Sequence, residues 1–227
     1  MSAVRHGNPG EWAKVKGTVM SLWPLFLCFA ALGALGASIA FGRHPAWFAG
    51  LFAAAVASTA VFWRKGLRRV ESFFKGARGE ERVAGLLETL PSSWHVFHDF
   101  EAGGHHVDHV VVGTAGVYAV ETKNWRGRVT VEKDEVLVDG TLPDRSPLMQ
   151  AVSQAKAVRT ALKGAGCDIE VVPVLCMASD TFDSPARTVA QATVLNASDI
   201  VSWMMGRGAA LAPNDVRRLA QLMETNV

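Results

Sequence analysis

Two long stretches without a charged residue occupy the first third of the chain, and they limit its fold more than any other feature. Residues 19–41 and 46–63 consist mainly of Ala, Leu, Phe and other apolar residues, and the short segment 42–45 separates them. A helix needs about 20 apolar residues to cross the ~30 Å hydrocarbon core of a bilayer, and a slightly shorter helix spans it with little tilt. The sequence therefore predicts a two-helix transmembrane hairpin, with a buried helical hairpin of a soluble protein as the alternative.

The basic residues around these runs predict the orientation of the hairpin. Lys14 and Lys16 precede the first run, the segment 64–69 after the second run contains four basic residues, and the connecting segment contains only Arg43. Loops on the cytoplasmic side of a membrane carry an excess of Lys and Arg. We therefore expect an inner (plasma) membrane protein with two spans, and with both termini and the following domain in the cytoplasm.

The membrane hairpin divides the rest of the chain into segments. Residues 1–18 are short and polar, so we expect a mobile or surface-lying cytoplasmic leader, and residues 64–72 are expected to form a basic juxtamembrane linker. Residues 73–227 are expected to form one folded domain, with a core at 73–178 and a C-terminal strand and helices at 188–225. Basic and acidic residues nearly balance in this domain, so a nucleic-acid contact there is expected to be local.

Hydrophobic periodicity predicts the fold class of this domain. One apolar helical stripe ends at Pro91, and a second one follows Pro147. The other apolar segments alternate with polar residues or run continuously over lengths typical of strands. Strands are predicted at 95–100, 105–112, 117–123, 128–133, 135–138, 169–177 and 188–195. Together with two more helices near the C-terminus, this order predicts an α/β sandwich around a mixed sheet.

The segment 105–125 contains the clearest hairpin pattern of the domain. Apolar strands flank the segment 113–116, Gly-Thr-Ala-Gly, whose composition is typical of a turn. If the strands pair symmetrically about the middle of this turn, Asp108 lies opposite Glu121, with Cβ atoms about 5 Å apart. Lys123 is two residues beyond Glu121, so it projects from the same face of its strand.

This pair of carboxylates predicts a metal site. Two carboxylates at such a distance repel each other, and the pair is destabilising unless a cation lies beside it. Mg²⁺ is usually held by one or two protein carboxylates together with substrate phosphate and water. Asp108 and Glu121 are thus candidate ligands of Mg²⁺ or Mn²⁺, and Lys123 is placed to position or activate a water molecule. The alternative is a partly exposed strand face on which Glu121 and Lys123 form a solvated pair.

Two further polar residues lie on or beside apolar helical stripes. Glu80 precedes Ala84 by four residues and Leu87 by seven, which places it on the inward-facing stripe of its helix. Gln154 lies next to the stripe of the helix that follows Pro147, from which it is expected to reach a site beneath. A zinc site is a separate alternative, although alternating strand positions point to opposite faces and converge poorly. Its ligands would be His98, His105, His106 and His109.

Several short segments of the domain carry a family resemblance. They are Gly76-x-x-Gly79-Glu80, Asp108 to Gly113, Gly116-Val117-Tyr118, Glu121-Thr122-Lys123-Asn124-Trp125-x-Gly127, and Pro147 with the downstream Gln154. Together they resemble the nuclease-related domain (NERD) family over about residues 73–163, although the last gap is longer than in the family's P-x-x-Q-A pattern. The family is considered a branch of the PD-(D/E)xK superfamily. The resemblance therefore implies a restriction-endonuclease-like mixed-sheet sandwich.

The same resemblance implies roles for individual residues. Asp108 and Glu121 match the metal ligands of the family, and Lys123 matches its catalytic lysine. Glu80 and Gln154 match supporting acidic and polar positions on the flanking helices. The expected nucleic-acid contacts are Lys123, Asn124 and Arg126.

The expected function is hydrolysis of phosphodiester bonds by a membrane-anchored nuclease. Mg²⁺ or Mn²⁺ is the expected cofactor, and DNA is favoured over RNA as the nucleic-acid partner. No small-molecule cofactor is expected, and the sequence does not indicate a homo-oligomer. The alternative is a module of the same fold that binds nucleic acid or protein at the membrane without cleaving it. Metal binding without cleavage would favour this alternative.

Overall fold

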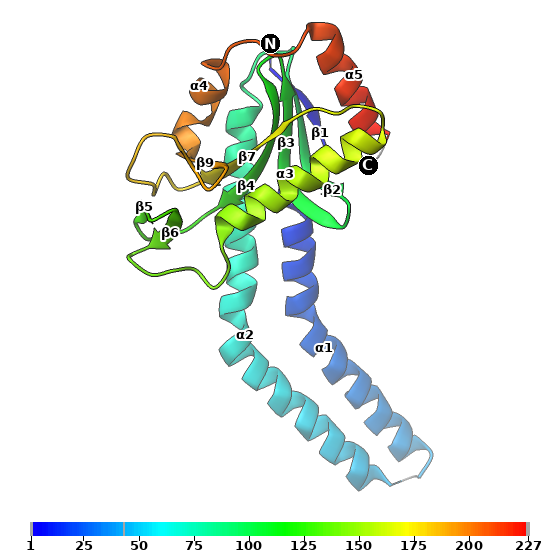
Figure 1. Ribbon diagram of the computed structural model, residues 1–227. Helices are drawn as coiled ribbons and strands as arrows, with labels where there is room; N and C mark the ends of the chain where they lie inside the picture. Colours follow the sequence, from blue (N-terminus) through cyan, green and yellow to red (C-terminus); the bar gives the residue numbers. More distant parts are fainter. Residues whose placement is uncertain (1, 43, 226–227) are drawn as a thin grey trace. The chain divides into compact units, whose positions relative to one another are not determined.

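The computed structural model describes residues 2–42 and 44–225, but not the side chains of residues 45 and 65–69 (Figure 1). The predicted turn residue Arg43 and three of the four basic side chains in 64–69 therefore lie outside the described part. The chain divides into two compact units, one made of Met1–Glu11 with Gly76–Val227 and the other of Trp12–Lys75. The first of these units contains every residue predicted to form the site.

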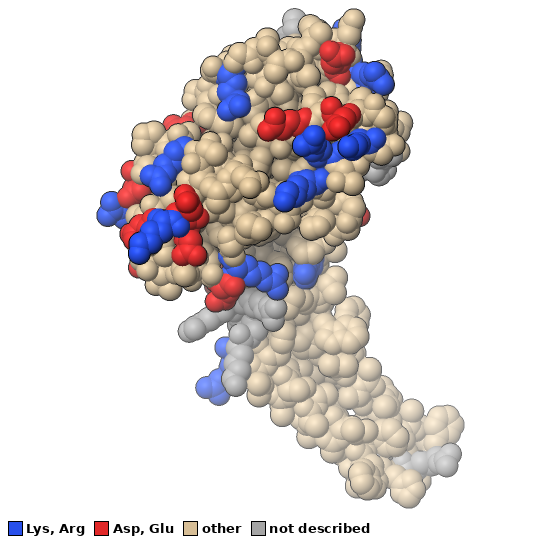
Figure 2. All heavy atoms as spheres, viewed as in Figure 1, with Lys and Arg blue, Asp and Glu red and all other residues tan. Residues whose placement is uncertain are grey.

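Two long helices supply the unit Trp12–Lys75, namely α1 (Glu11–Ala40) and α2 (Pro45–Leu87). They include two segments that are long and apolar enough to cross a membrane, Glu11–Ala40 and Ala46–Arg64. Large apolar side chains are exposed along them, including Phe29 at 70% and Trp47 at 77%. The visible surface of these segments is almost free of charged groups (Figure 2). A contiguous exposed apolar surface of this kind marks an interaction site for protein or membrane.

The helices extend beyond the boundaries expected from the sequence. Helix α1 begins at Glu11, and not at Val19. The expected juxtamembrane linker at 64–72 is not a separate segment, because α2 runs through it without interruption to Leu87. This stretch consists mostly of Arg, Lys, Leu and Glu and lacks proline, and those residues are good helix formers. The change from apolar to charged residues therefore does not interrupt the helical backbone.

A seven-stranded mixed sheet forms the centre of the other unit, with the strand order β1-β2-β3-β4-β7-β9-β8. Its strands are β1 (Val4–His6), β2 (His95–Ala102), β3 (His105–Gly113), β4 (Gly116–Lys123), β7 (Val171–Met177), β8 (Arg187–Val189) and β9 (Ala192–Asn196). Strands β2, β3 and β4 are antiparallel, whereas β7 is parallel to both β4 and β9. A separate two-stranded sheet consists of β5 (Val129–Glu132) and β6 (Glu135–Val138).

Helices cover both faces of the large sheet, as Figure 1 shows for α3 (Pro147–Gly164) in front of it. The short 3₁₀ helix η1 (Ala197–Asp199) leads into α4 (Ile200–Met205). One apolar cluster packs α4 and the end of α2 against the sheet residues Tyr118 and Val120. Another joins α3 and α5 (Pro213–Glu224) to the sheet through Val110 and Val117. Neighbouring residues of one strand enter different clusters because side chains alternate between the two faces. The structure confirms the predicted α/β sandwich around a mixed sheet.

The first strand corrects the expectation for residues 1–18. Val4 to His6 form an edge strand parallel to β2, with Val4 opposite His95. The His6 ring stacks on Phe97 with ring centroids 4.2 Å apart. A three-residue strand is too short to show a periodic pattern, so only its pairing with β2 identifies it. The part of the expected leader through Glu11 therefore belongs to this folded unit, and the rest lies in α1.

The segment predicted as one strand at 188–195 is a hairpin of β8 and β9. Its turn residues Ala190 and Gln191 have φ angles of 44° and 75°. Two consecutive positive φ values are typical of a type I′ turn, which usually contains Asn or Gly. The sequence Ala-Gln does not carry that signal, so the turn was missed.

Candidate functional site

The pairing of β3 with β4 confirms the predicted hairpin register and then departs from it. The ladder runs from Gly113 opposite Gly116 to His109 opposite Val120, which is symmetric about the predicted turn. The expected next pair, Asp108 with Glu121, does not extend this ladder. Instead, Oδ2 of Asp108 accepts a hydrogen bond of 2.7 Å from the backbone N–H of Thr122. The carboxylate is thus anchored to the neighbouring strand at the point where the regular pairing ends.

Asp108 lies in an environment that disfavours its charged form. Only 7% of the surface of Asp108 is exposed to solvent. Burial raises the pKa of this carboxyl well above its ordinary value, and the nearby charges of Glu121 and Glu80 raise it further. The N–H of Thr122 and the ammonium of Lys123 act in the opposite direction. Three carboxylates from α2, β3 and β4 therefore lie close enough to influence one another.

Glu121 is the centre of the hydrogen-bond network. It is 2% exposed, and its Oε1 accepts from Nζ of Lys123 at 2.5 Å. Its Oε2 accepts from Nε2 of Gln154 at 2.6 Å, and the same amide also donates to the backbone oxygen of His106 at 2.8 Å. Charge-assisted hydrogen bonds of this kind are the stronger ones. The structure thus joins the three predicted residues Glu121, Lys123 and Gln154 directly.

Gln150 belongs to this network although the sequence did not point to it. Its Oε1 accepts a hydrogen bond of 3.0 Å from Nζ of Lys123. Gln150 lies four residues before Gln154 on α3, and residues four apart share one face of a helix. That spacing was the available signal, but Gln150 is exposed and is not on the apolar stripe from which the site was predicted.

Glu80 approaches the cluster from α2. It is 8% exposed, and its buried Oε2 has no hydrogen-bond partner among the described residues. Burial raises the pKa of Glu80 to about 7, with additional contributions from the charges of Asp99 and Glu121 and an opposing one from His106. The structure therefore places Glu80 beside the hairpin carboxylates, as its position on the inward stripe of the helix predicted.

Asp99 and His106 are two further polar residues at the site. Nε2 of His106 lies 3.0 Å from Oδ1 of Asp99, and this hydrogen bond raises the pKa of His106. Asp99 has a positive φ of 52° inside β2, a conformation that only a small fraction of non-glycine residues adopt. Its Oδ2 also accepts the backbone N–H of Glu11 at 2.6 Å. The role of Asp99 was not visible in the sequence, because it depends on this local distortion of the strand.

Asn124 and Arg126, the other predicted nucleic-acid contacts, lie beyond the end of β4. Oδ1 of Asn124 accepts from Oγ of Ser179 at 2.5 Å, and Arg126 is exposed in the following loop. No interaction between Arg126 and the carboxylates is found among the described residues. Asn124 also packs against α2, because a Cβ added at Gly79 would lie 2.7 Å from its Cβ. Gly79 thus permits the close approach that brings the next residue, Glu80, to the site.

Gly79→Ala should displace α2 from Asn124 and destabilise the folded unit by about 1–3 kcal/mol, the usual range for overpacking. Gly85→Ala is the matched control on the same helix, because a Cβ there has open space. It should stabilise the protein by roughly 0.5–1 kcal/mol, since alanine is the better helix former. Thermal unfolding of both variants in detergent micelles checks this. Equal shifts in the two variants would contradict the close packing at Gly79.

The four histidines of the zinc alternative do not converge. Nδ1 of His98 lies 2.8 Å from Nδ1 of His109 in the interior, while His106 contacts Asp99 and His105 is exposed. Across residues 2–42 and 44–225, no group of three or more His, Cys, Asp and Glu side chains is arranged to hold a metal ion by itself. The zinc alternative is therefore wrong.

The buried pair of His98 and His109 predicts sensitivity to acid. Burial lowers the pKa of His98 to about 4 and that of His109 well below its ordinary value. A folded-state pKa below the unfolded value of 6.5 gives stability that is present above pH 6.5 and is lost as the pH falls toward 4. For His98 this loss amounts to about 3 kcal/mol. The melting temperature should fall between pH 6.5 and 4.5 in the wild type and less in a His98→Leu/His109→Leu variant, whereas His105→Ala should behave as the wild type.

The donor set of the carboxylate cluster suits a hard divalent cation. Asp108 and Glu121 supply carboxylate oxygens, and Oε2 of Glu80 is buried without a partner. Mg²⁺ commonly takes only one or two protein carboxylates and completes its six ligands with water and phosphate. A cation would also offset the burial, and the charge of Glu121, that raise the pKa of Asp108 and Glu80. The residues present therefore fit such an ion.

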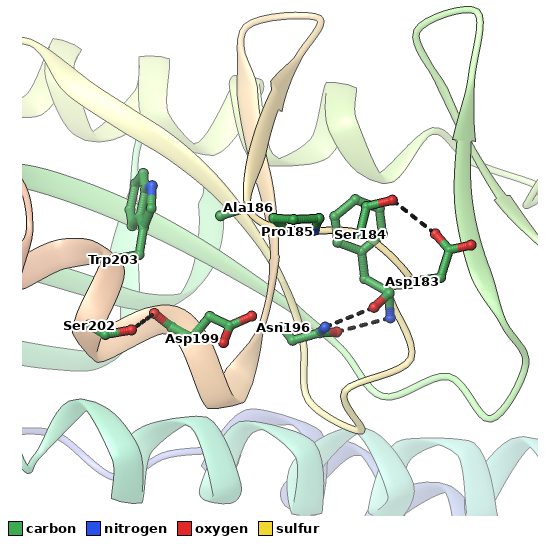
Figure 3. A pocket seen from close by; sticks show the side chains of 9 residues that line it. Asp183, Ser184, Pro185, Ala186, Asn196, Asp199, Ser202 and Trp203 are labelled. Carbon is green, nitrogen blue, oxygen red and sulfur yellow. Dashed lines mark hydrogen bonds between the residues drawn. The ribbon is translucent and has the colours of Figure 1, made fainter.

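A separate cavity of about 660 Å³ lies between the loop 182–186, the end of β9 and the start of α4 (Figure 3). None of the predicted site residues lines it. Its polar side chains serve the local fold: Asn196 forms hydrogen bonds with both backbone groups of Phe182, and Ser202 donates to the backbone of Asp199. This cavity therefore offers no cluster of reactive groups, and the carboxylate cluster is the better candidate for chemistry.

Comparison with known proteins agrees with this choice. The family model for the nuclease-related domain matches residues 75–178. That range contains Glu80, the hairpin of β3 and β4, and Gln154. No curated protein and no solved structure matches the chain.

Proposed function

Because residues 75–178 match the family model for the nuclease-related domain, we propose that the protein is a membrane-anchored, metal-dependent nuclease that hydrolyses phosphodiester bonds, with DNA favoured over RNA. The observation that carries this proposal is the buried network in which Glu121 contacts Lys123 and Gln154 beside Asp108 and Glu80. A structural strand face would not require three interacting carboxylates in the interior, since each raises the free energy of the others.

Asp108 and Glu121 would hold a Mg²⁺ or Mn²⁺ ion. When bound, such an ion polarises the phosphate and lowers the pKa of a bound water. The protein's own contribution is to fix the ligands before substrate arrives. The N–H of Thr122 orients the Asp108 carboxylate, and the amide of Gln154 orients that of Glu121. Groups held in this way cost little reorganisation during the reaction.

Lys123 is the residue proposed to act on the substrate. Its ammonium is held between Glu121 and Gln150, and its side chain is 22% exposed. It can therefore reach a phosphate or water at the surface of the site while its position remains defined. Its N–H groups would orient the attacking water and stabilise the negative charge that develops on the phosphate oxygens. Gln154 is a positioning residue, because it acts through Glu121.

The membrane part of the proposal depends on the two apolar helical segments. Each is long enough to cross a bilayer, and the basic residues at 14–16 and 64–69 favour cytoplasmic termini. The nuclease domain would then lie in the cytoplasm next to the inner leaflet. Extraction of the protein from membranes by detergent but not by carbonate at high pH tests the anchoring, and release by carbonate would contradict it.

The activity can be tested with the full chain purified in detergent micelles. Supercoiled DNA, single-stranded DNA and RNA are incubated with Mg²⁺, with Mn²⁺ or with a chelator, and the products are separated by electrophoresis. Metal-dependent cleavage, with DNA cut faster than RNA, is the expected result. Metal binding by calorimetry without any cleavage would instead support a silent binding module of the same fold.

A further inference from the structure

A groove of about 470 Å³ lies between the turn joining β2 to β3 and one face of α3. We call it the α3 groove and define it by Gly103 and His105 on one wall and by the α3 residues 153–161 that face them. The lining residues of α3 are Ser153, Lys156, Ala157, Thr160 and Ala161. Their spacing of three and four residues is that of one helical face, so the wall is a single continuous stripe.

The α3 groove begins next to the proposed active site. His105 precedes His106, whose backbone oxygen accepts the amide of Gln154. On the helix, Gln150 lies one turn before Ser153 on the same stripe, and it contacts Lys123. Lys156 follows Gln150 by six residues, which corresponds to about 9 Å along the helix axis. A polymer that reaches Lys123 would therefore have a continuous path past Ser153 to Lys156.

The charge of α3 suits a polyanion. The helix contains Lys156, Arg159 and Lys163 and no acidic residue, and Figure 2 shows Lys and Arg side chains over it, with acidic side chains of other segments beside some of them. Arg159 and Lys163 both contact Asp168. Within the described part of the chain, Lys156 has no such ion pair. The charge of Lys156 is therefore available to a bound ligand, and Lys156 lines the α3 groove.

The other lining groups favour a single strand that is bound without sequence recognition. His105 offers an exposed aromatic ring, and aromatic rings stack on any base. Gly103 and Gly104 have φ angles of 55° and 77° with open space around them, so the backbone of a ligand can approach them closely. The bidentate amide and guanidinium groups that read base edges are missing from the groove lining.

We propose that the α3 groove binds the single nucleic-acid strand adjoining the phosphate that is cleaved, with Lys156 on a neighbouring phosphate and His105 stacked on a base. This inference rests on the proposed nuclease function and adds to it a path for the substrate. The expected substrate is then single-stranded or locally unpaired nucleic acid, and its cleavage should depend little on its sequence.

The first test measures how salt affects binding. A fluorescent single-stranded oligonucleotide is titrated with the full chain in detergent micelles. The buffer contains Ca²⁺, and the salt concentration is varied from 50 to 300 mM. Each phosphate contact contributes a slope of about 0.7 to the dependence of log affinity on log salt for single strands. Lys156→Ala should reduce the slope by about that amount and weaken binding about three- to tenfold, equally for oligonucleotides of different sequence. Lys163→Ala removes the same charge from the same helix and should leave the slope unchanged.

The second test separates stacking from charge. His105→Ala should weaken the binding of a normal strand about five- to tenfold and leave the binding of an abasic strand of the same length unaltered. Lys156→Ala should weaken both strands to the same extent. Each variant is compared with the wild type for its melting temperature, because these exposed positions are not expected to affect folding.

The outcomes distinguish this inference from the proposed function. In one outcome, the wild type cleaves in a metal-dependent way while Lys156→Ala leaves the slope of log affinity against log salt unchanged. That result would overturn the binding role of the α3 groove and leave the nuclease proposal intact. Equal effects of Lys156→Ala and Lys163→Ala would also overturn it, because they would reflect the general charge of the helix. A wild-type protein that neither binds nor cleaves nucleic acid would overturn both.

Discussion

Lys123→Gln is expected to lower the metal-dependent cleavage rate by about 10²- to 10³-fold, the usual effect of removing one group that stabilises the transition state. The lysine lies between Glu121 and Gln150, so its positive charge is held within this network. Glutamine keeps most of the stem and one N–H donor for Glu121, so the buried carboxylate is not left without a partner. Cleavage rates at saturating Mn²⁺, compared with melting temperatures, separate a loss of chemistry from a loss of folding.

The choice of controls decides how this result is interpreted. Lys133→Gln changes an exposed lysine in the turn between β5 and β6 and should retain the wild-type rate. A Lys123→Gln protein that melts like the wild type but no longer cleaves supports a catalytic lysine. Equal metal-dependent cleavage by the wild type and Lys123→Gln would contradict the proposed catalytic role of Lys123.

The core of the fold could be predicted because its signals are local. The turn at 113–116 fixes the register of β3 and β4, and the alternating apolar residues of those strands follow from it. What escaped prediction depends on partners far away in the sequence. The strand Val4–His6 exists only because β2 offers an edge, and the Ala190–Gln191 turn is imposed by the pairing of β8 with β9.

The same distinction applies to the site. Glu121 and Lys123 are two residues apart on one strand, so their contact follows from strand geometry. Asp108 was expected as a simple cross-strand partner, but its carboxylate replaces a backbone acceptor for Thr122. The use of a carboxylate in place of a backbone acceptor cannot be inferred from the spacing of residues in the sequence, because it requires the two strands to separate at that point. Asp99 and Gln150 were missed for a similar reason: each joins the cluster through a neighbour on another element.

Glu80→Gln should make the metal-free protein more stable at pH 8 than the wild type, by up to about 3 kcal/mol. Burial raises the pKa of Glu80 to about 7 in the folded state, above its unfolded value near 4.5. Such a group contributes stability that is fully present below pH 4.5 and is lost as the pH rises through 7. Glutamine cannot ionise, so the stability difference between the variant and the wild type should grow from pH 5 to pH 8. Thermal unfolding in chelator over this range measures it.

Glu81→Gln is the matched control, because Glu81 is the next residue on α2 and is exposed. Its stability difference from the wild type should stay constant with pH. Mn²⁺ at pH 8 should raise the melting temperature of the wild type, since a ligand that binds only the folded state stabilises it, and Asp108→Asn should abolish that rise. A difference between Glu80→Gln and the wild type that does not change with pH would contradict the raised pKa of the buried Glu80 carboxyl. One reason for placing a cation beside Glu80, the cost of its buried charge, would then be lost as well.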